Sequence, residues 1–562
     1  MKKNILWVFL VIVISVFSFK SLLRPGYFPM HDDMQAMRVL QLDKCISDFQ
    51  FPCRWVPDMG YGYGYPQFIY YSPLPYYVME VFHLSGLQFI DSVKAGIVLG
   101  FVLSGIFMFL LGRSLWGNLG GLISSVFYIY APYHASDIYT RGAMGEFWAL
   151  VFLPLIFWAV LEYVRQEKIK YLIFLVLSIG CLLITHNITS VAFIPISALW
   201  AIYLIFYYKK TYLWKGLLLS SVWGVGIAGF FLLPVIFEKK FAHTETMIIG
   251  YFNYLAHFVS IKQLFTSSHW GFGSSELGQY DDLSFSIGIF HWLFALATLI
   301  VSFILRKKEK IFPLILFLFG IGIFGSFMTH QRSSFIWNSL PILAYFQFPW
   351  RFLTIIVFST SIIAGYLIFL IKSVSLKIFI SITLVLLVLL FNVSFFRPRE
   401  WYNISDKDKF SGQSWEKQLT ISIFDYLPIY AKFPPDKEAP REPVVSDGKA
   451  EFLYYNKGSN WQEGRIKVLT DKANIVIPLY YFPGFKVWVD GENTAIEKIG
   501  DLGLIGISVE KGDHIVKVKL LNTPVRTIGD IVSLGSLLLV LLVSLGIKPN
   551  ILLNKYKNII HV

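Results

Sequence analysis

The chain has 562 residues, of which 55% are hydrophobic and 15% are charged, and its mean hydropathy is +0.58. This composition is typical of a polytopic α-helical membrane protein. The net charge of +13 is no argument for nucleic acid binding, because much of the excess Lys and Arg lies in short loops between apolar runs and forms no concentrated basic tract. We therefore expect membrane lipids, and no nucleic acid, as partners.

Twelve apolar runs are long enough to cross a hydrocarbon core about 30 Å thick. The first starts with Lys2 and Lys3 as a signal peptide does, but no small-residue cleavage site follows, so we expect an uncleaved anchor. Residues 73–90 are also apolar; a crossing there would invert every later loop, and we interpret this segment as interfacial or re-entrant. The twelve predicted spans lie near residues 4–23, 92–112, 118–134, 146–164, 171–188, 190–207, 215–237, 285–305, 311–328, 352–371, 378–396 and 527–547.

The loops between these runs fall into two classes. Short basic loops lie at 165–170, 209–215, 306–310 and 372–377 and in the tail after residue 548. Long, chemically varied loops lie at 31–71, 133–146, 185–187, 238–282, 329–351 and 397–526. The positive-inside rule places the first class, with both termini, in the cytoplasm. We therefore expect a multi-pass plasma membrane protein whose active face is extracytoplasmic.

Residues 397–526 differ from the rest of the chain in having few apolar runs and several prolines. Strand-like residues lie at 474–481, 485–490, 506–509 and 514–520, and turns are predicted at Asp490-Gly491 and Lys511-Gly512-Asp513. We predict a small extracytoplasmic β-sandwich-like domain here. The expected organisation is a transmembrane domain at 1–396, this β-rich domain at 397–526, and a last helix with a cytoplasmic tail at 527–562.

The first outer loop opens with His31, Asp32 and Asp33. Adjacent carboxylates at a membrane interface are costly to desolvate, and such a group can act as a general base toward a hydroxyl; the alternative is a solvated start of a loop. A run of alternating glycines and tyrosines, with Tyr63 and Tyr65, follows at 60–66. Its rings suit either stacking on sugars or anchoring at the lipid interface.

Cys45 and Cys53 share this loop and either form a disulfide or stay free.

The second outer loop carries Arg141, whose planar guanidinium suits phosphate oxygens, with an ion pair to Asp137 as the alternative. Glu146 starts the next helix, where a carboxylate is favourable in any case.

Two further loops carry candidate binding residues. His186, at a tight turn between two helices, is either poised near neutral pH or satisfied by backbone carbonyls. Trp350 and Arg351 begin a helix from the outer side and are either a clamp for a lipid phosphate or an ordinary interfacial belt. Nucleotide-binding motifs such as GxxxxGK[ST] are missing from the sequence, and a nucleotide sugar would not reach an outward-facing enzyme. The sugar donor would then be linked to a lipid.

The chain resembles polytopic membrane glycosyltransferases of the GT-C type, in particular the bacterial and archaeal group labelled "6-pyruvoyl-tetrahydropterin synthase-related" membrane proteins, close to the YfhO-like proteins. The pterin part of that label is not carried over, because the histidine set of the soluble enzyme is missing. The residues that carry the resemblance are His31-Asp32 with the glycine–tyrosine run, Tyr139-Thr140-Arg141-Gly142-Ala143 with Glu146, Phe348-Pro349-Trp350-Arg351-Phe352, and Tyr481-Phe482-Pro483-Gly484-Phe485 with Val489-Asp490-Gly491.

The resemblance implies transfer of a sugar from a polyprenyl-phosphate-linked donor to a cell-envelope glycan, lipid or protein. The catalytic acidic residue would be Asp32, with Asp33 as the second candidate. A clear Asp-x-Asp pair is missing from this loop, which leaves open whether a divalent cation (Mg or Mn) takes part. The alternative functions are a transporter or flippase for envelope precursors and a non-catalytic assembly protein. Transporters usually place polar groups in the middle of the membrane, whereas the predicted helices carry few charges and the polar groups lie at one face. This pattern favours an enzyme over a transporter.

Overall fold

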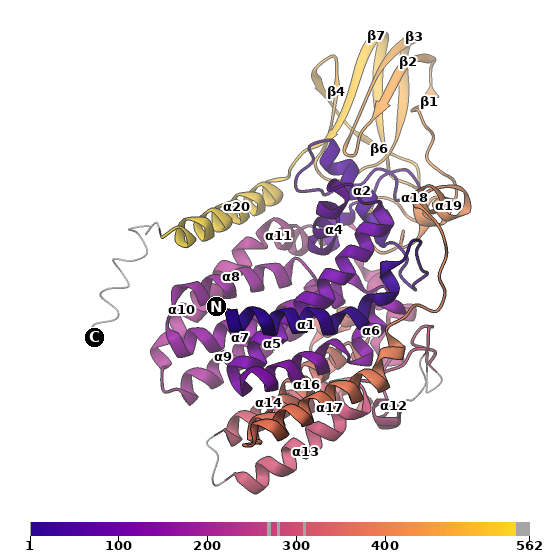
Figure 1. Cartoon of the computed structure of the whole chain (residues 1–562). Coiled ribbons are helices and arrows are strands. Elements are labelled where there is room, and N and C mark those ends of the chain that lie inside the picture. The colour runs from indigo at the N-terminus through magenta and orange to yellow at the C-terminus, as the bar shows by residue number, and fades with distance from the viewer. Residues whose placement is uncertain (1, 267–270, 278–280, 307–310, 547–562) are drawn as a thin grey trace.

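The computed structural model describes residues 2–266, 271–277, 281–306 and 311–546; part of the predicted 306–310 loop and the tail from 547 lie outside this range. A bundle of apolar helices carries an antiparallel sheet at one end (Figure 1). Among the described residues, eight helices are long and apolar enough to cross a membrane, or nine if the bent pair Thr211–Ile227 and Gly229–Phe237 forms one span. The chain is a multi-pass membrane protein.

The helices fall into three groups by length and composition. The long helices are α1 (Lys2–Phe19), α5 (Phe89–Ile129), α7 (Met144–Gln166), α9 (Asn187–Tyr207), α14 (Phe312–Thr329), α16 (Leu353–Leu370), α17 (Val374–Asn392) and α20 (Pro524–Ser544). Shorter apolar helices are α8 (Ile169–Leu183), α10 (Trp214–Ile227), α11 (Gly229–Phe237) and α13 (Ile289–Leu305). The remaining helices are α2 (Gln35–Ser47), α3 (Gln67–Tyr70), α4 (Leu74–Leu84), α6 (Pro132–Tyr139), α12 (Ile261–Thr266), α15 (Ser334–Ser339), α18 (Asp406–Lys409) and α19 (Gly412–Thr420).

Helix α5 contains two of the predicted spans, because it doubles back at Gly117. The Ser125 hydroxyl donates to the Gly105 carbonyl at 2.8 Å, although a straight helix would separate these residues by about 30 Å. Gly117 has φ 77°, a left-handed conformation that glycine adopts at little cost. Helices α8 and α13 occupy two more predicted spans but have only 15 and 17 residues. The count of twelve crossings therefore stays a prediction, although every predicted span contains a helix.

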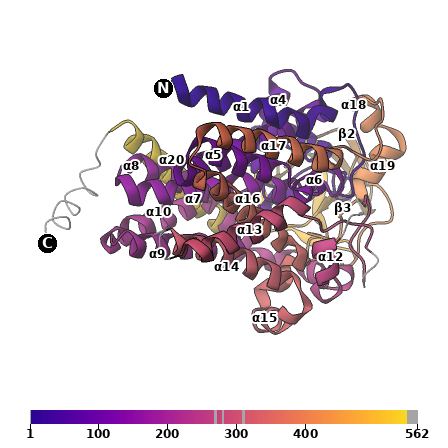
Figure 2. The same cartoon turned by 60° about the horizontal axis from the view of Figure 1, so that its bottom comes forward.

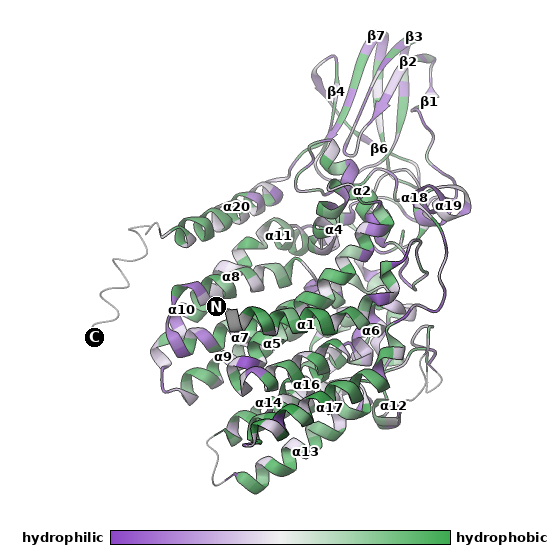
Figure 3. Cartoon of the chain, in the orientation of Figure 1, coloured by the Kyte–Doolittle hydropathy of each residue, from purple (hydrophilic) through white to green (hydrophobic). Residues whose placement is uncertain are grey.

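The centre of the bundle consists of α5, α7 and α16 (Figure 2). Buried residues make up 89% of the apolar window of α7 and 83% of that of α16, against 17% for α17 and α20. Figure 3 shows hydrophobic residues along most of the bundle, and hydrophilic residues in the sheet, in the segments beside it and at the opposite end of the bundle near α8 and α10. Helix α4, in the doubtful 73–90 segment, has 11 residues and spans about 16 Å, too short for a crossing.

The start of α1 and the end of α20 lie at the end of the bundle opposite the sheet (Figure 1). Helices α2, α4, α18 and α19 lie near the sheet end. The predicted outer loops and the predicted inner termini are thus separated along the bundle. The cytoplasmic assignment of the termini stays a prediction.

The C-terminal domain is a seven-stranded antiparallel sheet in the order β1-β3-β7-β4-β5, with β2 on β3 and β6 on β7. All seven strands belong to one hydrogen-bonded sheet, whereas the sequence predicted a sandwich-like domain. Its strands are β1 (Val444–Asp447), β2 (Ala450–Lys457), β3 (Trp461–Tyr480), β4 (Phe485–Val489), β5 (Glu492–Thr494), β6 (Glu497–Ile499) and β7 (Leu504–Leu520).

One predicted turn of this domain is confirmed and the other is wrong. Asp490 and Gly491, with φ 52° and 88°, connect β4 to β5. Residues 511–513 lie inside β7, where the pairing with β3 shifts register between Val468 and Lys472. The glycine at 512 therefore lies in an irregular stretch of a continuous strand. Residues 397–443 precede the first strand and form a connecting segment that contains α18 and α19.

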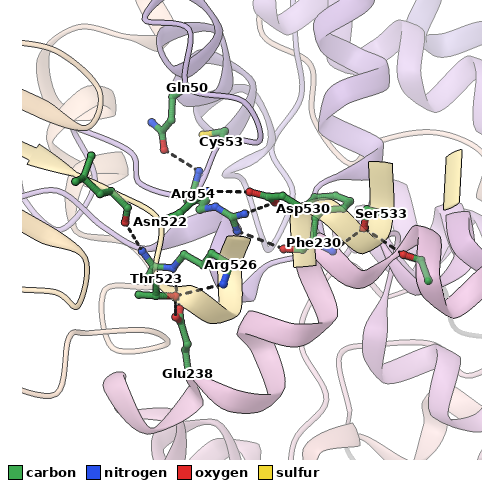
Figure 4. A network of polar contacts seen from close by, with 12 residues as sticks. Gln50, Cys53, Arg54, Phe230, Glu238, Asn522, Thr523, Arg526, Asp530 and Ser533 are labelled. Atoms are coloured by element: carbon green, nitrogen blue, oxygen red, sulfur yellow. Dashed lines mark hydrogen bonds and ion pairs between the residues drawn. The ribbon is translucent and has the colours of Figure 1, made fainter. Parts of the chain in front are cut away.

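Two ion pairs fix the start of α20 to the bundle (Figure 4). Arg526 Nε lies 2.9 Å from Glu238 Oε2, and both side chains are buried. Arg54 of the first loop lies 2.5 Å from Asp530. The Ser533 hydroxyl accepts a hydrogen bond at 2.7 Å from the Phe230 backbone N–H on α11. These contacts fix the sheet domain's outgoing helix beside α11 and the first loop.

Candidate functional site

A cavity of about 460 Å³ lies where the predicted outer loops meet. Seven of the ten residues predicted for the site line it. They are His31, Asp32, Arg141, Glu146, His186, Trp350 and Arg351. Asp33, Tyr63 and Tyr65 lie outside this lining. Loops that are far apart in the sequence thus converge on one space.

The wall next to α7 holds two arginines that share one carboxylate. Glu146 Oε2 lies 2.9 Å from Arg141 Nη2 and 3.3 Å from Arg351 Nε, and its side chain is 1% exposed. Arg141 also pairs with Asp137 at 2.5 Å, as one of the two sequence interpretations predicted. The indole ring of Trp350 lies under Arg141, 4.4 Å from its Cζ. These four charged residues are called the arginine cluster below.

The sequence predicted Glu146 and Arg351 as separate features, and the structure corrects this. Because α7 packs beside the start of α16, the carboxylate at the first turn of α7 reaches Arg351 as well as Arg141. Arg351 is mostly buried, at 12% exposure of its side chain, so it is not an ordinary interfacial belt residue. Its Nη1 donates to the Phe346 carbonyl at 2.6 Å and to Gln347 Oε1 at 3.3 Å. Its Nε, although near Glu146, makes no hydrogen bond within the described residues.

Asp32 lines the same cavity, and the backbone of the second loop holds it in place. The Asp32 N–H donates to the Arg141 carbonyl at 2.8 Å, and the His31 N–H donates to the Thr140 carbonyl at 2.9 Å. A β-carbon on Gly142, whose φ is 68°, would lie 2.9 Å from the Asp32 carbonyl oxygen. This close approach of two backbones requires glycine and places Asp32 near the arginine cluster.

Arg38 of α2 orients the Asp32 carboxylate, and the sequence analysis missed it. Its Nη1 lies 3.1 Å from Asp32 Oδ2, its side chain is 3% exposed, and its guanidinium packs 4.0 Å from the ring centroid of Tyr71. The signal was a single arginine on a helix that begins directly after the two aspartates. Asp425, which comes from the connecting segment and lines the same cavity, was also missed.

Asp33 points away from the cavity. Its Oδ2 lies 2.7 Å from Lys409 Nζ of α18, and burial raises the pKa of this carboxyl above its ordinary value. Asp33 therefore joins the first loop to the connecting segment. His186 lines the cavity as the N-cap of α9. Its Nδ1 contacts the Thr189 hydroxyl and accepts from the Thr189 N–H at 3.4 Å, so the ring is bound by Thr189 and not by backbone carbonyls, the second sequence interpretation.

The two tyrosines predicted as a sugar platform are buried in the protein. The Tyr65 hydroxyl donates to the Ser422 carbonyl at 2.9 Å and accepts from the Tyr426 N–H at 2.7 Å. The Tyr63 ring packs against Tyr480 of β3, with 5.5 Å between centroids. Neither the stacking on sugars nor the lipid-interface role fits these positions. The glycine–tyrosine run instead attaches the first loop to the connecting segment and the sheet.

Of the two alternatives for Cys45 and Cys53, the structure has the disulfide. Gln50 lies inside the loop that this disulfide closes, and its amide donates to the carbonyl of Trp55 just beyond that loop at 3.0 Å.

The donor set of the cavity does not fit a divalent cation. Within the described residues, no group of three or more His, Cys, Asp or Glu side chains is arranged to hold a metal. Asp32 and Glu146 each face a guanidinium, which already neutralises the carboxylate. The chemistry below is therefore derived from the side chains alone.

Comparison with known proteins assigns no family. No family model matches the chain. A Lactococcus lactis subsp. cremoris (strain MG1363) protein described as uncharacterized is 23% identical over 329 residues, which make up 56% of this chain and 49% of that protein. The chain thus spans about half the length of this relative.

Among solved structures, the apo Archaeoglobus fulgidus oligosaccharyltransferase is 12% identical to this chain, with a TM-score of 0.43. The alignment covers 79% of this chain and 61% of the oligosaccharyltransferase chain. The Archaeoglobus fulgidus oligosaccharyltransferase AglB in complex with an inhibitory peptide and a dolichol-phosphate aligns over the same shares at 13% identity and 0.42. Scores below 0.5 do not establish a shared fold, so the function is argued from the cavity.

Proposed function

We propose that this protein is a membrane glycosyltransferase that moves a sugar from a polyprenyl-phosphate-linked donor to a cell-envelope acceptor on the extracytoplasmic side. The observation that carries the proposal is that Asp32, Arg141 and Arg351 line one cavity. A base and two phosphate-binding cations are the parts that this reaction needs. The proposal includes a relationship of this chain to the YfhO-like proteins.

The arginine cluster binds the donor phosphate in this proposal. Arg351 has a guanidinium nitrogen without a hydrogen-bond partner among the described residues, and a guanidinium binds two phosphate oxygens at once. Glu146 neutralises part of the positive charge, which keeps two buried arginines stable side by side before the donor arrives. The phosphate then competes with this carboxylate for Arg351.

Asp32 acts as the general base toward the acceptor. It removes the proton of an acceptor hydroxyl as the acceptor oxygen bonds to the anomeric carbon of the sugar. The bond between that carbon and the phosphate oxygen breaks, and its electron pair stays on the lipid phosphate, where the arginines stabilise the charge. Arg38 contributes by fixing the direction of the Asp32 carboxylate.

The test uses the purified protein in proteoliposomes with a panel of radiolabelled polyprenyl-phosphate sugars. Release of polyprenyl phosphate, with water or added glycans as acceptor, reports turnover. We expect Asp32→Asn to lower the rate about 10²- to 10⁴-fold, which is the usual contribution of a positioned base. Asp33→Asn is the matched control, because that carboxyl faces Lys409 outside the cavity. Equal rates in the parent protein and Asp32→Asn would exclude this role for Asp32.

The same panel separates the enzyme from the flippase alternative. A flippase would move the labelled lipid to the other leaflet and leave the bond between sugar and phosphate intact. Flipping without any release of polyprenyl phosphate would overturn the proposed function.

A further inference from the structure

A second carboxylate reaches the cavity from outside the helix bundle. Asp425 belongs to the connecting segment between α19 and the sheet, and its side chain lines the same cavity as Asp32. The proposed reaction has so far used only residues of the membrane domain, so Asp425 is a polar group of the cavity without a role.

Asp425 sits on a segment that is held on both sides. Tyr65 bonds to the backbone of Ser422 and of Tyr426, the residues that flank Asp425. The Tyr426 ring stacks on Tyr70, with 5.4 Å between centroids and 30° between planes. The buried Tyr65 thus fixes the place of Asp425, which gives the glycine–tyrosine run a function in building the site.

We propose that Asp425 and Asp32 together bind an acceptor with at least two neighbouring hydroxyl groups, which makes the acceptor a glycan or glycolipid and not a protein. Asp32 takes the proton of the hydroxyl that attacks the sugar, and Asp425 accepts a hydrogen bond from the adjacent hydroxyl. The Ser422 side chain already donates one hydrogen bond to Asp425, and the carboxylate can accept a further one from the acceptor. A serine or threonine side chain bound at Asp32 offers no second hydroxyl for it. The inference rests on the proposed function and specifies its acceptor.

The electrostatic surroundings of Asp425 support a role that depends on pH. Burial, together with the negative charge of Asp32, raises its pKa to about 6, and Arg38 and a hydrogen bond from the Ser422 side chain oppose this rise. The carboxyl is therefore mostly neutral at pH 5 and mostly ionised at pH 8. The other titratable groups near Asp425 are Tyr65, Tyr71 and Tyr426.

The ionised form of Asp425 is the stronger hydrogen-bond acceptor, so binding of a diol should weaken as the pH falls through about 6. In this proposal Arg141 and Arg351 hold the donor phosphate, whereas Asp32 and Asp425 hold the acceptor. The acceptor KM should therefore respond to this carboxyl, whereas the donor KM should not.

The experiment measures both KM values in proteoliposomes for the parent, Asp425→Asn, Asp425→Glu and the control Asp501→Asn. Asp501 pairs with Lys432 on the surface and is 56% exposed. For a glycan acceptor with adjacent hydroxyls at pH 8, we expect Asp425→Asn to raise the acceptor KM about 10-fold or more, as loss of a charge-assisted hydrogen bond does. Asp425→Glu should restore part of the affinity, and the parent should lose affinity at pH 5.

The outcomes separate this inference from the proposed function. If the parent releases polyprenyl phosphate but Asp425→Asn keeps the parent's acceptor KM and pH profile, the inference is wrong and the proposed function stands. If a peptide with a single hydroxyl is an equally good acceptor, the inference is also wrong. If the parent releases no polyprenyl phosphate with any donor, both are overturned.

Discussion

Replacing Glu146 with Gln removes the carboxylate that Arg141 and Arg351 share while keeping the size of the side chain. Tyr133 donates to the other oxygen of Glu146 at 2.7 Å. A glutamine that keeps this bond through its carbonyl must turn its NH₂ group toward two guanidiniums, which are also donors. The substitution therefore replaces an attraction with a mismatch of donors in a buried site.

The magnitude follows from what each arginine retains. Arg141 keeps its pair with Asp137 at 2.5 Å, whereas Arg351 has no other carboxylate partner among the described residues. Breaking one buried ion pair by removing one partner costs about 3–5 kcal/mol. Because only Arg351 becomes unpaired, and its contact is the longer one, we expect a loss near the lower limit, about 3 kcal/mol.

The measurement is unfolding in mixed micelles during titration with SDS, followed by tryptophan fluorescence. Glu167→Gln is the matched control, because Glu167 directly follows the same helix and pairs with Lys210 while being 41% exposed. An exposed pair of this kind contributes about 1 kcal/mol or less.

Polyprenyl phosphate should restore more stability to Glu146→Gln than to the parent, because the phosphate replaces the missing negative charge. A loss no larger than that of Glu167→Gln would refute the shared-carboxylate account of the arginine cluster. Equal stabilisation of Glu146→Gln and the parent by polyprenyl phosphate would refute the competition between Glu146 and the phosphate.

Three further predictions concern the donor, folding and topology. Arg351→Lys keeps the charge but loses the two-pronged contact, so the donor KM should rise about 10- to 100-fold with the acceptor KM unchanged; unchanged donor saturation would contradict this. The pKa of Asp425 is higher in the folded protein than in the unfolded chain, so the free energy of unfolding falls as the pH rises from about 4 to about 6. Asp425→Asn should therefore be more stable than the parent at pH 8 by up to about 3 kcal/mol, and equally stable at pH 4. A melting temperature of Asp425→Asn below the parent's at pH 8 would contradict it. With Cys181 replaced by Ser, a membrane-impermeant thiol reagent on intact cells should label Ser446→Cys of β1 and not Lys168→Cys before α8, and the reverse pattern would invert the topology.

The parts of the site that could be predicted from the sequence are those set by local patterns. A charged residue at the end of an apolar helix must lie near a membrane surface. The assignment of the long loops to the extracytoplasmic side places the helix ends beside those loops at the same surface. For this reason Asp32, Arg141 and Arg351 were expected at one face and do share a cavity. Their distances to one another depend on how α7 packs beside α16, which no local pattern contains. The double role of Glu146 was missed for that reason.

Other errors have equally physical causes. A buried tyrosine beside glycines has the same sequence pattern as one that stacks on sugar, and only the packing of residues 422–426 distinguishes them for Tyr65. Strands β1 and β2 were not predicted because both faces are partly or fully exposed, and therefore no clear alternation marks them. The glycine at 512 resembled a turn because a glycine in a strand irregularity and a glycine in a turn satisfy the same backbone requirement.

The central claim is that the cavity binds the phosphate of a lipid-linked sugar. The most direct measurement is a cryo-electron microscopy structure of the protein in lipid nanodiscs with a polyprenyl phosphate. We predict density for the phosphate within hydrogen-bond distance of Arg351 and next to Arg141, in the cavity that Asp32 also lines, with the isoprenoid chain leaving toward the lipid. A polyprenyl phosphate bound elsewhere, with the arginine cluster still closed on Glu146, would contradict the account.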